Sequence, residues 1–341
     1  MKIPNFTVQW HLVTACGNSC RHCYIDKKRE SLPLEKMQAI VNNLKQIIAI
    51  WGCRLTISFS GGDPLLYPHF FQLLDYLKRE IPDCDIRILG NPELLTPEII
   101  EKLKDYNLFY YQISLDGKRE IHDYFRYPGS FNESVTKLQL LAESGIKTAV
   151  MSTVSRDNIN EIPDLVDLVA EIGVNFYDFS RFIPIGRGSE MKNSSFILPE
   201  EFRQFLIEMQ ERYKKHEDKQ TFFGRKEPLW KLLQYEEGTF EPLKDDKGLI
   251  WSGCNIGATS VTILEDGTVL ACRRLPVVIG YTPQQTIRDL FISSDRLNYL
   301  REYDKIETCK DCPLLLYCRG CRAVAFASEG NYFAPDPQCW K

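Results

Sequence analysis

Residues 6–23 read FTVQWHLVTACGNSCRHC, a β-rich run followed at once by three cysteines. The run Phe6–Thr14 predicts a strand because it is rich in β-branched and aromatic residues. Cys16, Cys20 and Cys23 follow this strand in one short loop. A strand that carries reactive side chains at its C-terminal end is the pattern repeated through the first half of the chain.

From residue 6 to about residue 183, β-rich runs alternate with amphipathic helical runs. The predicted strands are Phe6–Thr14, Leu55–Ser60, Asp85–Leu89, Phe109–Leu115, Lys147–Thr153 and Phe176–Phe182. The predicted helices are Leu34–Trp51, Phe70–Arg79, Pro97–Lys104, Asn132–Ser144 and Ile159–Ile172. Six strand–helix units in a row predict a parallel sheet with right-handed crossovers. Six are too few for a closed eight-stranded barrel, so we expect an α/β fold, a partial, open (β/α)6 barrel of the TIM type.

The chemically distinctive residues fall at the C-terminal ends of these strands, where barrels of this type place their active sites. Gly61-Gly62-Asp63-Pro64 follows the second strand and Gly90-Asn91 follows the third. Ser114 and Asp116 close the fourth strand, and residues 181–188 close the sixth. The sequence therefore predicts one site at this end of the barrel.

The bulk composition excludes several classes of protein. The chain has 341 residues, enough for two domains, and its hydrophobic content of 44% is ordinary for a globular protein. A net charge of −4 predicts no broad electrostatic binding of nucleic acid or anionic lipid. No apolar run is long enough to span a membrane, and Met1–Val8 is too short and too polar for a secretory signal. We expect a cytoplasmic protein with no nucleic-acid and no membrane partner.

Twelve cysteines in a reducing compartment predict metal ligands rather than disulfides. They are clustered, with three near the start of the chain and seven after residue 250. Thiolates are the usual ligands of iron–sulfur clusters, and a four-iron cluster held by three cysteines leaves one iron open for a small molecule. A zinc knuckle completed by His22 or His11 is the alternative for the first group.

The order of these motifs resembles the radical SAM superfamily. Cys-x3-Cys-x2-Cys follows the first strand, and Gly61-Gly62-Asp63-Pro64 stands where that family usually has Gly-Gly-Glu-Pro. The resemblance implies that Cys16, Cys20 and Cys23 are catalytic and hold a 4Fe–4S cluster whose open iron binds S-adenosylmethionine. Reductive cleavage of that cofactor would then give a 5′-deoxyadenosyl radical, which abstracts hydrogen from the substrate.

The same resemblance implies the contacts to S-adenosylmethionine. The backbone of Gly61, Gly62 and Asp63 would contact the methionine amino group, and the backbone of His22 would contact adenine. Residues 181–188 match the segment that lines the adenine. Two further side chains would contact the cofactor directly, and they are Ser114 and Arg126.

The C-terminal cysteines resemble the seven-cysteine SPASM domain, which carries two auxiliary 4Fe–4S clusters. Their order is Cys254, Cys272, Cys309, Cys312, Cys318, Cys321 and Cys339. The runs Ser260–Leu264 and Thr268–Ala271 around Asp266-Gly267 predict a hairpin. One or two zinc sites are the alternative for these cysteines.

The resemblance implies how the seven cysteines divide. Cys309, Cys312, Cys318 and Cys339 would ligate the distal cluster, and Cys254, Cys272 and Cys321 the proximal one. Only two residues separate Cys318 from Cys321, where the family usually has three. The chain would then bind three 4Fe–4S clusters and leave two cysteines, Cys53 and Cys84, as buried hydrophobic residues.

The predicted domains are residues 1–190, a radical SAM partial barrel, residues 191–250, a helical bridge, and residues 251–341, the SPASM domain. The bridge contains a predicted helix from Pro199 to about His216.

Members with a SPASM domain mostly modify peptides, so we expect a maturase that installs a crosslink or similar modification on a small ribosomal peptide. Anaerobic sulfatase maturases place an Asp base just after the cysteine that matches Cys272, whereas Arg273 and Arg274 follow here. Two arginines suit a carboxylate-bearing substrate.

The partners expected with this chemistry are the precursor peptide and a reductase such as flavodoxin or ferredoxin. The first strand begins almost at Met1 and leaves no room for an N-terminal leader-binding domain, so a separate leader-peptide-binding protein is expected. The alternative substrates are a porphyrin or another small molecule. A zinc or electron-transfer protein without S-adenosylmethionine chemistry is the alternative from another class.

Overall fold

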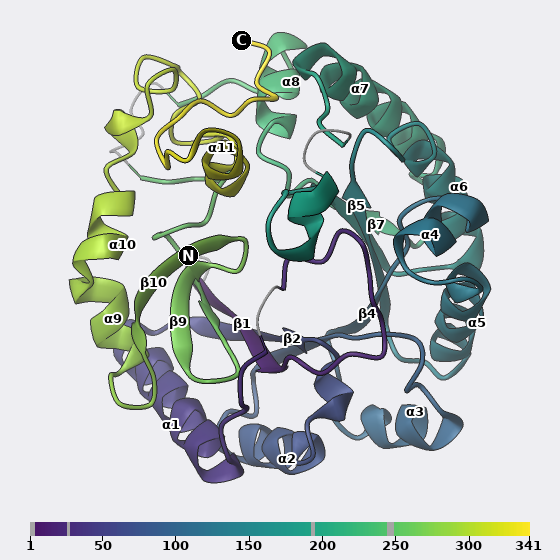
Figure 1. The fold of residues 1–341 in the computed structure, drawn as a ribbon, viewed down its shortest axis with the longest axis vertical. Coiled ribbons are helices and arrows are strands. Elements are labelled where there is room, and N and C mark those ends of the chain that lie inside the picture. The colour runs from purple at the N-terminus through teal and green to yellow at the C-terminus, as the bar shows by residue number, and fades with distance from the viewer. Residues whose placement is uncertain (1–3, 26–27, 192–194, 244–248) are drawn as a thin grey trace.

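The computed structural model describes residues 4–25, 28–191, 195–243 and 249–341, so residues 192–194 and 244–248 of the predicted bridge lie outside it. Its described strands form one sheet in the order β10-β9-β8-β1-β2-β3-β4-β5-β6-β7. Figure 1 shows this sheet curving inside a ring of helices, with the loop after β1 on its inner side. The strands are β1 (Asn5–Val13), β2 (Arg54–Gly61), β3 (Asp85–Leu89), β4 (Tyr110–Ser114), β5 (Thr148–Val154), β6 (Phe176–Arg181), β7 (Phe222–Phe223), β8 (Ser260–Ile263), β9 (Thr268–Cys272) and β10 (Leu275–Tyr281).

Most of the helices cover the outer face of the sheet, whereas α11 (Arg322–Glu329) lies inside the ring (Figure 1). The helices are α1 (Leu34–Trp51), α2 (Phe70–Glu80), α3 (Pro97–Lys104), α4 (Arg119–Phe125), α5 (Ser130–Glu143), α6 (Ile162–Ile172), α7 (Pro199–Lys215), α8 (Trp230–Glu236), α9 (Ile287–Ser293), α10 (Asp295–Leu300) and α11 (Arg322–Glu329). The six predicted strands and five predicted helices of the barrel all form, with bounds that shift by at most three residues. The open α/β barrel expected from the sequence is therefore confirmed. Helix α4 was not anticipated.

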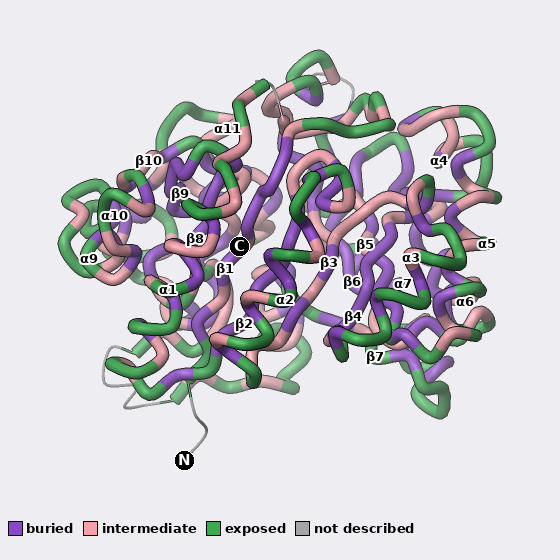
Figure 2. The backbone as a smooth tube through the Cα atoms, turned by 90° about the horizontal axis from the view of Figure 1, so that it is seen from below, coloured by how far each residue is buried: buried purple, intermediate pink, exposed green. Residues whose placement is uncertain are grey.

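The core lies between strands and helices, as Figure 2 shows by the buried strands and the exposed outer sides of the helices. Helix α1 buries one stripe at helical spacing, Met37, Ile40, Val41, Leu44 and Ile47. It ends at Gly52, whose positive φ of 59° suits glycine and whose N–H donates to the Ile48 carbonyl. On β1, Trp10 is fully buried and packs against Phe59 of β2.

The predicted hairpin forms, but it belongs to the same sheet as the barrel. Strands β8 and β9 pair antiparallel, with Thr262 opposite Leu270. Strand β8 also pairs in parallel with β1, with Thr7 opposite Ser260. The unpaired backbone N–H and C=O groups of an edge strand can pair with another chain. Strand β8 pairs with these groups of β1, so β1 is not an edge strand. The C-terminal cysteines are thereby attached directly to the strand that leads into Cys16.

Within the described residues, no helix has both the length and the apolar character needed to cross a membrane.

Candidate active site

A cavity of about 650 Å³ opens at the C-terminal ends of strands β1 to β6. The three cysteines of the first loop line it, as the strand-end argument predicts. The other predicted site residues on its wall are His22, Gly61, Gly62, Ser114 and Arg126. Asp63 does not belong to this wall, because it is buried beneath the loop with 1% of its surface exposed.

N–H groups point at the sulfur atoms of the first cysteine loop. The Cys16 Sγ accepts from the Asn91 side-chain amide at 3.1 Å and from the Asn18 backbone N–H at 3.4 Å. The Cys20 Sγ accepts from the Arg126 guanidinium at 3.7 Å. Such donors stabilise thiolates, the form in which cysteine binds iron. Burial raises the pKa of the Cys20 and Cys23 thiols, so iron binding there would release protons. The loop thus fits a cluster held by three thiolates.

The paired glycines after β2 hold the cysteine loop by direct backbone contact. The Gly62 N–H donates to the Val13 carbonyl at 2.7 Å, and the Asp63 N–H donates to the Ala15 carbonyl at 2.8 Å. A Cβ atom added at Gly62 would lie 1.9 Å from the Ala15 oxygen, so only glycine allows this approach. The Asp63 carboxylate accepts from the Leu65 and Asn91 backbone N–H groups and so fixes Asn91 beside Cys16.

Arg126 is held by a buried carboxylate. Its Nε donates to Asp116 Oδ2 at 2.8 Å, and Asp116 has no exposed surface. Burial raises the pKa of Asp116, but Arg126, His22 and further favourable contacts outweigh it and lower that pKa to about 2. The carboxylate is therefore ionised and aligns the guanidinium with its remaining N–H groups toward the cavity and Cys20. His122 and Asp123 are structural: His122 Nδ1 accepts from the Asp116 backbone N–H, and Asp123 accepts from the backbone at the start of α5.

This geometry predicts unequal losses of S-adenosylmethionine affinity. Arg126→Ala should weaken binding by about 2–5 kcal/mol if its guanidinium meets the desolvated carboxylate of the cofactor. Ser114→Ala should cost about 0.5–1.5 kcal/mol, as a neutral hydrogen bond does. Equilibrium dialysis of the anaerobically reconstituted variants measures both losses, with thermal melting as a check that Asp116 without its partner has not unfolded the protein. Unchanged affinity in folded Arg126→Ala would leave Arg126 with the structural role alone.

The C-terminal cysteines do not all line the same pocket. Four of them line one small, largely apolar pocket: Cys309, Cys312, Cys318 and Cys339. The other three do not line this pocket, and Cys254 lies within electrostatic range of both Cys272 and Cys321. Burial raises the pKa of both Cys309 and Cys321 to about 11, so both thiols hold their protons until a metal replaces them. Cys53 is buried in the barrel core, and Cys84 is partly buried and packs against the same core.

The zinc alternative makes its own demand on the geometry of the ligands. One zinc ion draws four ligands to about 2.0–2.3 Å from its centre, which requires them to lie close together. Within the described residues, no three His, Cys, Asp or Glu side chains are grouped closely enough to hold a single metal ion. His11, one of the candidate zinc ligands, lies buried in β1 and bonds with Gln9 and Tyr24.

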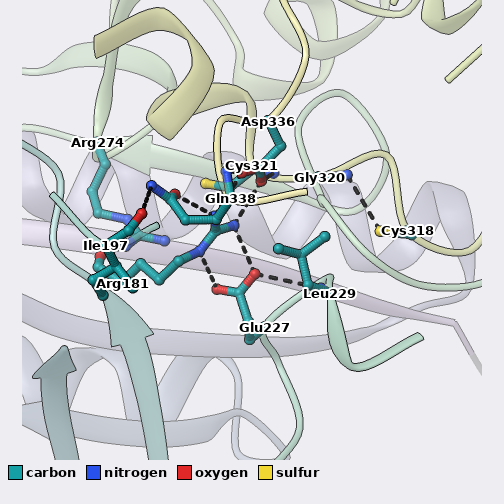
Figure 3. A network of polar contacts seen from close by, with 10 residues as sticks. All are labelled: Arg181, Ile197, Glu227, Leu229, Arg274, Cys318, Gly320, Cys321, Asp336 and Gln338. Atoms are coloured by element: carbon teal, nitrogen blue, oxygen red, sulfur yellow. Dashed lines mark hydrogen bonds and ion pairs between the residues drawn. The ribbon is translucent and has the colours of Figure 1, made fainter. Parts of the chain in front are cut away.

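Sequence reasoning missed a buried ionic network that joins β6 to the C-terminal region. Figure 3 shows Arg181 between Glu227, Asp336 and Gln338. Its Nη2 lies 2.7 Å from Glu227 Oε1 and its Nη1 lies 2.6 Å from Asp336 Oδ1. Asp336 Oδ2 also accepts from the Cys321 backbone N–H at 2.6 Å. The network therefore ties the barrel to a proposed cluster ligand.

Comparison with known proteins agrees with this geometry. The family model described as the radical SAM superfamily matches residues 10–169, and the iron–sulfur cluster-binding domain model, SPASM, matches residues 254–313. An Fe-coproporphyrin III synthase of Methanosarcina barkeri is 32% identical, over 98% of this chain and 87% of its own. The AdoMet-dependent heme synthase of the same organism is 28% identical, over 97% and 95%.

A peptide maturase is also among the relatives. Mycofactocin maturase MftC of Mycolicibacterium smegmatis is 27% identical, over 97% of this chain and 81% of its own. The fold matches that of Streptococcus suis SuiB bound to S-adenosylmethionine, with a TM-score of 0.79 at 16% identity, over 99% of this chain and 78% of SuiB. With a relative above 30% identity along nearly its whole length, the chain belongs to the radical SAM superfamily and is a radical SAM enzyme with a SPASM iron–sulfur domain.

Proposed function

We propose that this enzyme abstracts a hydrogen atom from a ribosomally made peptide and so installs a crosslink or a similar modification. The observation that carries the proposal is the shared cavity. Its wall contains the loop with Cys16, Cys20 and Cys23 and also Arg273 and Arg274, which directly follow the proximal cluster ligand Cys272. A substrate in this cavity lies against both parts of the enzyme at once.

The residues on the wall have distinct roles in this proposal. Cys16, Cys20 and Cys23 hold the radical cluster, and Ser114 and Arg126 bind S-adenosylmethionine beside it. When bound, the radical cluster with this cofactor supplies a 5′-deoxyadenosyl radical, and the auxiliary clusters supply an acceptor for the electron that the substrate radical must lose. The backbone of Gly61-Gly62-Asp63 keeps the cysteine loop in place, which fixes the cofactor relative to the substrate.

Two auxiliary sites agree with a chain of electron transfer. Cys254, Cys272 and Cys321 would hold the cluster next to the cavity, and the four cysteines of the small pocket would hold the distal one. A reductase such as flavodoxin or ferredoxin would supply the first electron, and a separate leader-binding protein would deliver the peptide. These partners fit the proposal that the enzyme works in the cytoplasm.

A porphyrin is the second candidate substrate, and a specific observation favours it. The relative with 32% identity is a synthase of Fe-coproporphyrin III, a porphyrin with several carboxylate side chains. The cavity of the present chain is rich in cationic side chains, which suits such a substrate. The maturase MftC, at 27% identity, supports the peptide instead.

Separate assays with the two candidate substrates test the proposal. Reconstituted enzyme is reduced anaerobically with S-adenosylmethionine and given either Fe-coproporphyrin III or synthetic peptides encoded by short reading frames beside its gene. Mass spectrometry should show one peptide lowered in mass by two hydrogens, the change expected for a crosslink, with 5′-deoxyadenosine formed in proportion. Unchanged peptides together with a modified porphyrin would reject the peptide and favour the second candidate.

A further inference from the structure

The charge of the cavity wall is one-sided. No Asp or Glu of the described part of the chain lines it. The cationic side chains that do are Lys28, Arg126, Arg181, Arg187, Arg273 and Arg274. A low-dielectric cavity lined by one sign of charge concentrates ligands of the opposite sign. Away from the three cysteines, the wall therefore favours anionic ligands.

The two arginines of the hairpin lack a carboxylate partner, unlike two others on the wall. Arg126 is paired with Asp116 and Arg181 with Glu227 and Asp336. Arg273 donates instead to the Gln9 side-chain oxygen at 2.7 Å, and Arg274 donates to the Arg181 carbonyl at 3.1 Å. In the described residues neither arginine has a carboxylate within ion-pair distance.

The fold fixes both arginines at the mouth of the barrel. They form the tip of the hairpin between β9 and β10, where Cys272 pairs with the fully buried Leu275. Gln9 belongs to β1, and the Arg181 carbonyl ends β6, so the tip is anchored to the first and the last of the six predicted barrel strands. Figure 3 shows Arg274 beside Arg181. A tip held on both sides is a rigid element from which to present charge.

Adjacent cations at a partly desolvated wall repel one another, and only an anion removes that cost. Arg274 interacts electrostatically with Cys321, which would be a thiolate once the cluster is bound. Among the described residues the buried Arg273 Nε has no hydrogen-bond partner, so the protein does not fully satisfy this guanidinium on the cavity wall. A guanidinium with an unused N–H at a cavity wall fits the two oxygens of a carboxylate.

We propose that Arg273, supported by Arg274, binds a carboxylate of the substrate and thereby sets which C–H bond faces the 5′-deoxyadenosyl radical. This rests on the proposed function, in which the substrate occupies the cavity. The carboxylate belongs to a peptide, as an acidic side chain or C-terminus, or to a porphyrin propionate.

The test compares charged and neutral forms of each candidate ligand by their Kd for the reconstituted enzyme with S-adenosylmethionine. The probes are Fe-coproporphyrin III against its methyl esters, and the peptide modified by the enzyme against the same peptide with its carboxylates converted to amides. The wild type should bind the charged form of one pair about 30-fold or more tightly than the neutral form. In Arg273→Gln this preference should fall to a few-fold. Arg273→Lys should be intermediate, because it keeps the charge and loses the fork.

The control is Arg288→Gln, which changes a half-buried arginine of α9 whose one ion pair within the described residues is with its neighbour Asp289. It should keep the full preference for the charged ligand. If a ligand binds and is modified but Arg273→Gln discriminates charge as the wild type does, the carboxylate subsite is wrong while the proposed function stands. If no peptide binds to the wild type, the proposed function is rejected. If Fe-coproporphyrin III does not bind either, the carboxylate subsite is rejected with it.

Discussion

Replacing Cys16, Cys20 and Cys23 together with alanine should abolish 5′-deoxyadenosine formation and leave the other clusters in place. The three thiols share one loop on the cavity wall, whereas the seven C-terminal cysteines lie in two other groups. The wild type should bind about twelve irons, and the triple variant about eight, because each cluster holds four. Iron and sulfide analysis after anaerobic reconstitution measures the iron content. Chromatography of 5′-deoxyadenosine measures cleavage of the cofactor.

The matched control is Cys84→Ala, which removes a cysteine that packs against the barrel core. It should keep the full iron content and the full rate of cofactor cleavage. Residual 5′-deoxyadenosine in the triple variant would contradict the assignment of the radical cluster. About four irons with stoichiometric zinc in the wild type would reject the two auxiliary clusters and leave the radical cluster unaffected.

The second large effect concerns the Arg181 network. Arg181→Met leaves Glu227 and Asp336 buried without their partner, which should lower the free energy of unfolding by about 3–5 kcal/mol. Arg203→Met is the control, because the Arg203–Glu236 pair is about one-third exposed on both sides and should cost at most about 1 kcal/mol. Anaerobic urea unfolding measures both values. Equal losses in the two variants would contradict a special role for the buried network.

The same variant should respond to pH with a defined sign. Burial raises the pKa of Asp336, but Arg181 and backbone hydrogen bonds outweigh it and hold that pKa below its usual value. A depressed carboxyl pKa stabilises the fold above the unfolded value of about 3.9 and loses this effect as the pH falls through the folded value. The stability difference between wild type and Arg181→Met should therefore be full at pH 7 and shrink below about pH 4.

Asp336 also accepts a hydrogen bond from the Cys321 N–H, so Arg181→Met should lower the iron content of the auxiliary sites in particular. Loosening Asp336 moves Cys321 and the neighbouring Cys339, one ligand of each auxiliary site. We expect Arg181→Met to lose auxiliary iron before it loses the radical cluster. If Arg181 only stabilised the barrel, the variant would lose iron from all three clusters to the same extent.

The strands of the barrel could be predicted from local pattern alone, because each is a short β-rich run bounded by a helix at regular spacing. The reactive strand ends followed from the same pattern, since parallel strands bring their C-terminal ends to one edge. Helix α4 escaped prediction because seven residues are too few to show a helical period. The close contact of Gly62 with the Ala15 backbone was not predicted, because it joins two loops that are far apart in the sequence.

Strand pairings and ion pairs between distant segments could not be predicted from the sequence. The pairing of β8 with β1 joins residues some 250 positions apart, and nothing in either segment specifies the other. Arg181 was expected only as part of a segment along adenine, yet its side chain pairs with Asp336, 155 residues later. Buried ion pairs of this kind depend on the packed fold, and a single sequence shows only that charged residues are present.

Transfer of a label from the substrate to the cofactor tests the central claim most directly. The enzyme is reduced with unlabelled S-adenosylmethionine in the presence of the fully deuterated peptide, and the 5′-deoxyadenosine is examined by mass spectrometry. If the chain abstracts hydrogen from this peptide, deuterium appears in the 5′-deoxyadenosine in proportion to modified peptide. Unlabelled 5′-deoxyadenosine beside an unmodified peptide would contradict the account.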